Sequence, residues 1–386
     1  MIWNTGTNRL KQGDKGDLMG EIKQRDYSFD IFRGICMWAI PVSHFTRMGG
    51  CFSQDSWGGV VYITINVFIM QSFMFLSGYF SKNVEKSRRT SFKTALWPYI
   101  LSIPFFYAVR LLVYGNATFY IDQPPFAMWF MLALFVYKFF LKDMIKVPHF
   151  LAICITLYMT AGCISFLTEF MALGRIVSYL PFFVIGYYCK PEHIQKIKSL
   201  KRYQTAILAA GLMAVSFVLA YCVPQISQEW YLLRNPGSYL GVPWYLDIAC
   251  RGFIFLLAVG WIILMFTILP SKDNYLAYVG RNTMPVYIFH LIIRQILKKT
   301  DITMGLFPMP QSPIVYYLLI YVLASACVVV FSSKPVSKAY DFAVDGLYKI
   351  FMWTVDNVFL RIMGLFERGL IFAGSRLLSF TERQKK

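Results

Sequence analysis

Residues 30–44 read DIFRGICMWAIPVSH, an apolar run that contains an aspartate, an arginine and a histidine. An ionisable side chain inside a membrane span costs several kcal/mol unless it is paired or hydrated, so each is a functional candidate. Arg33 and His44 are 11 residues apart, which on a helix returns to within about 20° of the same face, roughly 16 Å further along the axis. Asp30 precedes Arg33 by one turn and can orient its guanidinium. The stretch therefore predicts a membrane helix with a functional stripe.

The composition of the whole chain agrees with a membrane protein. Of 386 residues, 57% are hydrophobic, 18% aromatic and 15% charged, against roughly 25% charged in soluble domains. A net charge of +18 would suggest nucleic acid in a soluble protein. Here the basic residues lie between apolar segments, so we expect them to orient the chain among membrane lipids and expect no nucleic-acid partner.

Ten apolar segments have about the length that crosses the hydrocarbon layer. They are 30–48, 60–80, 94–114, 126–141, 149–168, 173–189, 204–223, 243–268, 276–297 and 313–332. No internal repeat is evident. The sequence therefore predicts an all-α, polytopic bundle of about ten transmembrane helices.

The distribution of basic residues orients this bundle. With the N-terminus in the cytoplasm, 29 of the 38 Lys and Arg residues fall in inner segments and 5 in outer ones. The other four, Arg33, Arg110, Arg251 and Arg294, fall inside spans. Such a bias follows the positive-inside rule for an even number of crossings. We predict a multi-pass protein of the cell membrane with both termini cytoplasmic.

Two terminal regions flank the predicted bundle. Residues 1–25 are polar and rich in Gly and Lys, which predicts a flexible cytoplasmic leader ahead of a membrane domain at 26–332. Residues 333–386 stay apolar, with a helical period, but are interrupted by charges. This pattern favours an amphipathic helix on the inner leaflet over an eleventh span.

Further polar residues stand in the eighth and ninth spans. Asn282 and His290 lie in the ninth, with Arg294 one turn after the histidine. In the eighth span, Asp247 and Arg251 have the i,i+4 spacing of a same-helix ion pair. That pair is interpreted either as structural or as a substrate contact.

Two groups of residues suggest less specific roles. The eight cysteines are scattered without metal-ligand spacing, so no metal is expected. Five basic residues lie between spans two and three. They either set the topology and attract anionic lipid, or bind a phosphorylated ligand. These are Lys82, Lys86, Arg88, Arg89 and Lys93.

Six stretches of the chain resemble one known family in the order of its spans. They are RDYSFDIFRGICMWAIPVSH (25–44), FMFLSGYF (73–80), LWPYI (96–100), MWFMLALF (128–135), GRIVSYLPFFVIGYYCK (174–190) and YVGRNTMPVYIFHLII (278–293). With the Arg–His spacing of the first span, these stretches resemble the membrane acyltransferase type 3 family, particularly its branch related to fucose 4-O-acetylases.

The resemblance implies ten spans and an O-acyltransferase. The reaction expected is transfer of an acyl group, usually acetyl, from cytoplasmic acyl-CoA to a hydroxyl of an extracytoplasmic or lipid-linked glycan. It also implies that His44 is catalytic and that Arg33 is its partner near the donor.

The remaining roles are hypotheses built on this reaction. Asp30 and His290 join the catalytic group. His44 is expected to act as the general base or as an acyl relay. His290 is expected to stabilise the oxyanion or to contact the sugar. The pantetheine arm is expected to run along the first span from Arg33 to His44. The donor phosphates are assigned to Arg33, Lys86, Arg88 and Arg89. The acceptor is assigned to Trp129, Arg175 and Asn282.

Two other classes of protein remain open from the sequence alone. Intramembrane charges also mark transporters of sugars or small anions, and a non-catalytic scaffold for glycan assembly would need neither His44 nor Arg33. The acyl group, the acceptor and the oligomeric state, a homo-oligomer included, are not fixed by the sequence.

Overall fold

The computed structural model describes residues 25–47, 52–164, 167, 170–224, 229–304, 313–361, 363 and 371. Within these residues every regular element is a helix and there is no strand, which confirms the predicted all-α class. The predicted leader, except for Arg25, and the end of the tail lie outside the described residues.

The α-helices follow in chain order. They are α1 (Ser28–Thr46), α2 (Trp57–Tyr79), α3 (Val84–Ser91), α4 (Trp97–Tyr114), α5 (Trp129–Met144), α6 (Phe150–Thr160), α7 (Leu173–Tyr188), α8 (Pro191–Lys198), α9 (Arg202–Phe217), α10 (Glu229–Leu232), α11 (Trp244–Ile268), α12 (Tyr275–Arg281), α13 (Thr283–Met304), α14 (Pro313–Phe331) and α15 (Lys334–Thr354). Short 3-10 and π segments join some of them: η1 (Phe92–Leu96), η2 (Phe126–Met128), η3 (Ala161–Cys163), η4 (Phe170–Ala172), η5 (Val218–Cys222), η6 (Gly237–Leu240) and η7 (Val355–Phe359).

Six helical segments of the described chain are long and apolar enough to cross a membrane. They are Trp57–Tyr79, Val84–Tyr114, Phe170–Tyr188, Arg202–Cys222, Trp244–Ile268 and Ile314–Phe331. All ten predicted spans overlap helices, but the count of ten crossings and the orientation stay predictions.

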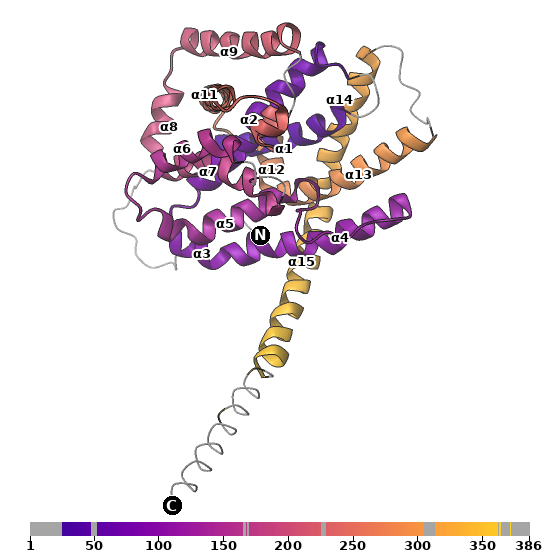
Figure 1. The fold of residues 1–386 in the computed structure, drawn as a ribbon. Coiled ribbons are helices and arrows are strands. Elements are labelled where there is room, and N and C mark those ends of the chain that lie inside the picture. Colours follow the sequence, from indigo (N-terminus) through magenta and orange to yellow (C-terminus); the bar gives the residue numbers. More distant parts are fainter. Residues whose placement is uncertain are drawn as a thin grey trace, which may run out of the picture. The chain divides into compact units, whose positions relative to one another are not determined.

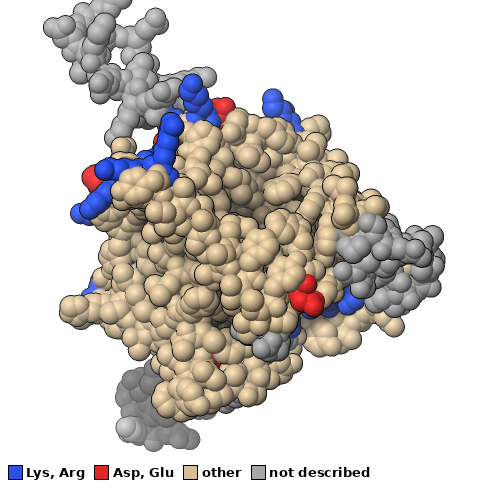
Figure 2. Space-filling view, turned by 90° about the horizontal axis from the view of Figure 1, so that it is seen from above, with Lys and Arg blue, Asp and Glu red and all other residues tan. Residues whose placement is uncertain are grey.

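The surface of these helices suits a hydrocarbon environment. Ile207, Leu256 and Val322, on three of them, are 67, 69 and 66% exposed. Figure 2 shows a face with few charged residues over its centre, and with Lys and Arg at its rim, most of them toward the upper left. Apolar side chains on such a surface are favourable only where lipid replaces water.

Two predicted elements differ from the structure. The predicted inner loop 81–93 is helical, because Asn83 caps α3 by accepting a hydrogen bond from the Lys86 amide at 2.9 Å, and η1 continues the coil into α4. The predicted ninth span is broken at Asn282 into α12 and α13. Pro285 explains the break, since its ring lacks an N–H and collides with the carbonyl four residues earlier.

Backbone contact between α1 and α12 fixes the centre of the bundle. A Cβ on Gly34 would overlap the Leu276 carbonyl, and one on Gly280 would overlap the Asp30 carbonyl. Small residues let membrane helices approach this closely and gain dispersion energy along the whole crossing. The crossing brings the start of α13 alongside the second half of α1 (Figure 1).

A second glycine pair joins α2 to α7. A Cβ on Gly78 would overlap the Phe183 carbonyl, and one on Gly186 would overlap the Phe75 carbonyl. Helix α1 also packs on α2 and α14, and α11 packs on α2. The residues that carry the chemistry are therefore built on tightly packed elements.

A buried ion pair anchors α11. Arg251 Nε donates to the Asp247 carboxylate at 2.8 Å and Nη1 to the Ser178 hydroxyl at 3.1 Å. A Cβ on Gly162 would strike this carboxylate. The contacts within the protein favour the structural interpretation of this pair.

The chain divides after Ser337 into two compact units. In the second unit, the described part of α15 is helical and carries exposed Phe342, Ile350 and Trp353. The helix and its exposed apolar side chains are consistent with the predicted amphipathic tail, whose place on the inner leaflet stays a prediction.

Candidate active site

Two histidines from distant parts of the chain meet inside the first unit. His44 Nδ1 lies 2.9 Å from His290 Nε2, and the two rings stack with centroids 5.1 Å apart. His290 is fully buried. The crossing of α1 over α12 at Gly34 and Gly280 puts these two positions side by side.

The hydrogen bonds determine which ring nitrogens carry protons. His290 Nδ1 lies 2.7 Å from the Val286 carbonyl oxygen, which can only accept, so His290 Nδ1 holds the proton. In a neutral ring, His290 Nε2 is then an acceptor, and Nδ1 of His44 must donate to it. Nε2 of a neutral His44 therefore carries a basic lone pair.

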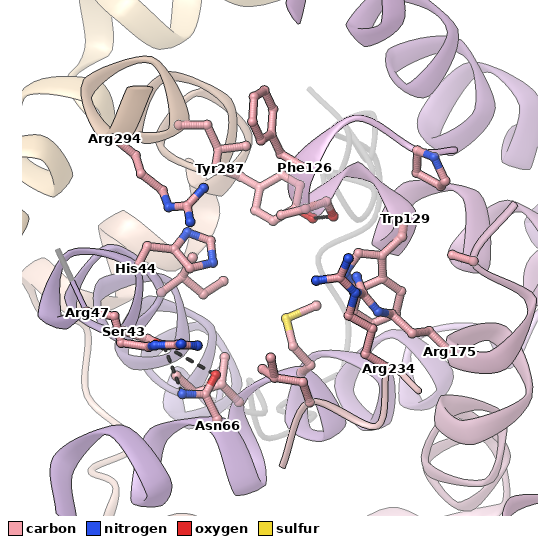
Figure 3. Close-up of a pocket in the computed structure, with 18 of the residues that line it drawn as sticks. Ser43, His44, Arg47, Asn66, Phe126, Trp129, Arg175, Arg234, Tyr287 and Arg294 are labelled. Atoms are coloured by element: carbon pink, nitrogen blue, oxygen red, sulfur yellow. Dashed lines mark hydrogen bonds between the residues drawn. The ribbon is translucent and has the colours of Figure 1, made fainter. Parts of the chain in front are cut away.

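A polar pair orders the helix surface beside His44. The Asn66 amide donates to the Ser43 hydroxyl at 2.9 Å and to the Tyr62 carbonyl at 2.8 Å. The bond to Ser43 ties α2 to α1 next to the imidazole, as the dashed lines in Figure 3 show. Such contacts limit the rotation of the groups that position His44.

His44 lines a cavity of about 780 Å³, large enough for one or two sugar rings. Six basic side chains and no carboxylate occur among its described lining residues. The basic residues are Arg47, Arg110, Arg175, Arg234, Arg294 and Lys298. Figure 3 shows Arg47 and Arg294 beside His44, with Arg175 and Arg234 on the opposite wall.

Aromatic rings hold three of these guanidinium groups. The pairs are Arg47 over Tyr62, Arg110 over Phe126 and Arg175 over Trp129, with 5.5, 4.5 and 5.1 Å from guanidinium carbon to ring centroid. A ring face attracts a cation without neutralising it. The cavity wall thus remains positively charged.

The opposite end of α1 carries a separate charged cluster. Arg33 donates to Asp30 at 3.0 Å, as the sequence predicts, and Arg25 pairs with the same carboxylate at 2.6 Å. Asp30 and Arg33 are both buried. The guanidinium of Arg33 also lies 4.6 Å from the centroid of Phe80.

Phe80 lines a second, more open cavity of about 660 Å³ with Lys82, Lys190 and three tyrosines. Lys82 donates to the carbonyls of Gly186, Tyr187 and Cys189, and so caps the end of α7. Partial burial lowers the pKa of Lys82. With its donors used in this way, Lys82 is a structural cation.

The structure separates several residues that the sequence groups together. His44 lines the first cavity, whereas Arg33 lines neither and contacts Phe80, which lines the second. The predicted path along the first span therefore does not lie in one cavity lined by both residues. Asn282 lines neither cavity, and its amide donates to the Tyr278 carbonyl at 2.9 Å. Both Trp129 and Arg175 do line the His44 cavity.

The basic cluster assigned to donor phosphates lies on α3. Arg88 pairs with Asp143 and donates to the Phe139 carbonyl at 2.7 Å, while Lys86 and Arg89 are exposed. The Arg88 hydrogen bond lowers the pKa of Asp143. None of the three basic residues lines either cavity.

Sequence reasoning missed Asn66 and five of the six cavity cations, all except Arg175. From the sequence, Arg47, Arg110 and Arg234 are membrane-boundary residues, Arg294 is a neighbour of His290, and Lys298 belongs to an outer segment. The available signal was their place in or beyond the outer half of the spans, where basic residues are rare. A group of His, Cys, Asp or Glu suited to a metal is absent from the described residues.

Comparison with known proteins identifies one family. The acyltransferase 3 family model, described as an acyltransferase domain, matches residues 26–333, which is more than half of the chain. No curated protein and no solved structure matches this sequence.

Proposed function

We propose, since this chain belongs to the acyltransferase 3 family, that it moves an acyl group from cytoplasmic acyl-CoA to a hydroxyl of an extracytoplasmic or lipid-linked glycan. Family membership makes the chain a membrane acyltransferase rather than a transporter or a scaffold. The single observation that carries the proposal is the His44–His290 pair at the wall of a cavity. The fucose 4-O-acetylase-like branch remains part of the proposal.

His44 is the proposed general base. Its Nε2 takes the proton of the acceptor hydroxyl while the oxygen attacks the thioester carbon. The C–S bond then breaks, and CoA leaves as a thiol with the proton returned by His44. In a relay, Nε2 itself would first accept the acyl group and pass it to the hydroxyl. His290 holds the His44 ring and its tautomer in either case.

The tetrahedral intermediate needs a positive charge near its oxyanion. Arg294 follows His290 by one turn, and its guanidinium points toward His44 in Figure 3. Arg47 lies on the other side of the same imidazole. We assign Arg294 to the oxyanion, because its helix also fixes the catalytic pair.

The donor is proposed to approach from the end of α1 that carries Arg33. Arg33, whose guanidinium lies against Phe80, and Lys190 support a binding site for the CoA phosphates at the second cavity. Lys86, Arg88 and Arg89 remain candidates for a peripheral contact. Because the two cavities are distinct, the proposal requires an acyl arm that spans roughly 16 Å along α1, a distance set by the 1.5 Å rise per residue.

The central test replaces His44 in the full-length protein reconstituted in nanodiscs. Radiolabelled acetyl-, propionyl- or succinyl-CoA is offered with envelope glycans from cells that lack the gene. His44→Ala is expected to lower transfer at least about 100-fold, the typical worth of a positioned base. Its thermal stability and CoA binding should stay close to wild type.

A surface histidine provides the matched control. His193 is exposed on α8, so His193→Ala is expected to keep wild-type transfer. Near-normal activity in His44→Ala would remove His44 from the mechanism. Label that stays on CoA in every wild-type reaction would count against the acyl-CoA donor itself.

A further inference from the structure

The cavity beside His44 has a charge that acyl transfer alone does not require. We propose that it binds an acceptor glycan bearing oxyanions, carboxylate or phosphate, and that its basic side chains hold these groups while a hydroxyl meets His44. This inference rests on the proposed function and specifies the chemical class of the acceptor.

The positions of the basic residues along the chain provide the first argument. Basic residues are disfavoured on the extracytoplasmic side of a membrane protein, and the predicted outer segments hold five in all. Four of the five line this one cavity, namely Arg47, Arg175, Arg234 and Lys298. Convergence of rare residues from four separate segments indicates a common ligand rather than topology.

Arginines inside the spans provide the second argument. Arg33 and Arg251 each pair with a buried carboxylate of their own helix, at 3.0 and 2.8 Å. Arg110 and Arg294 line the cavity instead, and neither forms an ion pair with another described residue. A desolvated cation normally requires a counter-charge, which a bound anion would supply.

The arrangement of the cations indicates more than one anionic group. Figure 3 shows Arg47 and Arg294 on the His44 side, and Arg175 and Arg234 beyond the open centre near Trp129. Guanidinium forks match the geometry of carboxylate and phosphate oxygens. Phe126 and Trp129 line the same cavity, and each ring holds one of the guanidinium groups.

Electrostatic repulsion among the basic side chains supports the same inference. Figure 3 shows Arg47 and Arg294 both beside His44, where their like charges repel each other. A neutral glycan would leave this repulsion in place, whereas an anion would relieve it. Binding should therefore favour anionic acceptors and weaken as salt screens the charges.

The first experiment identifies the charge of the product. Wild-type protein in nanodiscs receives radiolabelled acetyl- or propionyl-CoA and total envelope glycans and lipid-linked sugars from cells that lack the gene. Labelled products freed from CoA are then separated on an anion exchanger. We expect the label to be retained and to be released by salt.

Chemical treatment distinguishes the two oxyanions. Hydrogen fluoride removes phosphate, and carbodiimide with borohydride reduces carboxylates, so the treatment that makes the product neutral identifies its charge. Labelled product that passes the column uncharged would overturn the anionic acceptor while leaving acyl transfer intact. Label that never leaves CoA would instead overturn the proposed function.

The second experiment tests the side chains with the retained acceptor fraction. Arg47→Gln and Arg110→Gln are each expected to raise the acceptor KM about tenfold or more, the worth of a charge-assisted hydrogen bond. The acyl-CoA KM should not change. Arg47→Lys, which keeps the charge, should recover part of the affinity. Lys196→Gln, on the exposed surface of α8, serves as the control.

One outcome would assign the cations to another ligand. If Arg47→Gln and Arg110→Gln left the acceptor KM unchanged but reduced the amount of anionic phospholipid that co-purifies, the cavity would bind a lipid headgroup. That result would overturn the inference.

Discussion

At the scale of single residues, the chemistry depends on the proton that two imidazoles share. Val286 contributes only a carbonyl oxygen, yet that acceptor fixes His290 and, through His290, fixes the protonated nitrogen of His44. His290 is therefore a positioning residue, with no need to touch the substrate. The arrangement resembles in logic the carboxylate that orients the histidine of a hydrolase triad.

This role of His290 can be separated from a general structural one. His290→Ala removes the acceptor for the His44 proton, and we expect kcat to fall about 100-fold or more, since a wrong tautomer costs up to about 10⁴ in a triad. His290→Gln, whose amide oxygen can accept the same bond, should retain more activity. Steady-state kinetics would show unchanged donor KM in both variants. Equal kcat for wild type and His290→Ala would contradict the role.

Arg33 is predicted to act on the donor. Arg33→Gln should raise the acyl-CoA KM about tenfold, because the cation behind Phe80 is lost. Folding should be tolerated, since Arg25 still pairs with Asp30. Lys272→Gln is the control, because Lys272 is exposed and lines neither cavity. Donor titrations that give identical KM values for Arg33→Gln and wild type would exclude this contact.

At the scale of helices, the site depends on how closely α1 and α12 approach. Gly34 and Gly280 have no side chains, so the backbones of the two helices come into contact. The break at Asn282 then allows α13 to run in a different direction from α12. If the ninth helix were continuous, the direction of α12 would determine where the His290 side chain points. The proline after the break therefore contributes to the geometry of the histidine pair.

Enlarging this crossing should affect stability and activity together. Gly34→Leu is expected to destabilise the protein by about 3 kcal/mol, the upper range for overpacking, and to abolish transfer by moving α13 away from His44. Gly211→Leu on α9, where an added Cβ meets no atom within 4 Å, is the control. Thermal unfolding followed by size exclusion measures the stability, and the radiolabelled transfer assay measures the activity. A Gly34→Leu protein with wild-type stability and activity would rule out the proposed crossing.

At the scale of the whole molecule, orientation decides which cavity meets the donor. The charge distribution predicts that the α8 loop is cytoplasmic and that residues 224–242 are outside. If so, the Arg33 end of α1 faces the acyl-CoA pool and the His44 cavity faces the extracytoplasmic acceptor.

Cysteine labelling of intact cells tests this orientation. In a background without native cysteines, Tyr239→Cys is expected to react with an impermeant maleimide in intact cells. Lys196→Cys should react only after permeabilisation. Both positions are exposed, so access depends on the side of the membrane. The reverse pattern would invert the assignment of the two cavities.

The sequence by itself determined the membrane class, the all-α fold and the Asp30–Arg33 and Asp247–Arg251 pairs. These features depend on local hydrophobic length or on a spacing of three or four residues within one helix. Only the tertiary structure decided that His44 meets His290, 246 positions away, and that six basic residues from five separate segments line one cavity. Contacts of this kind depend on helix crossings at glycines such as Gly34 and Gly280, and a glycine in a sequence does not specify which helix will approach it.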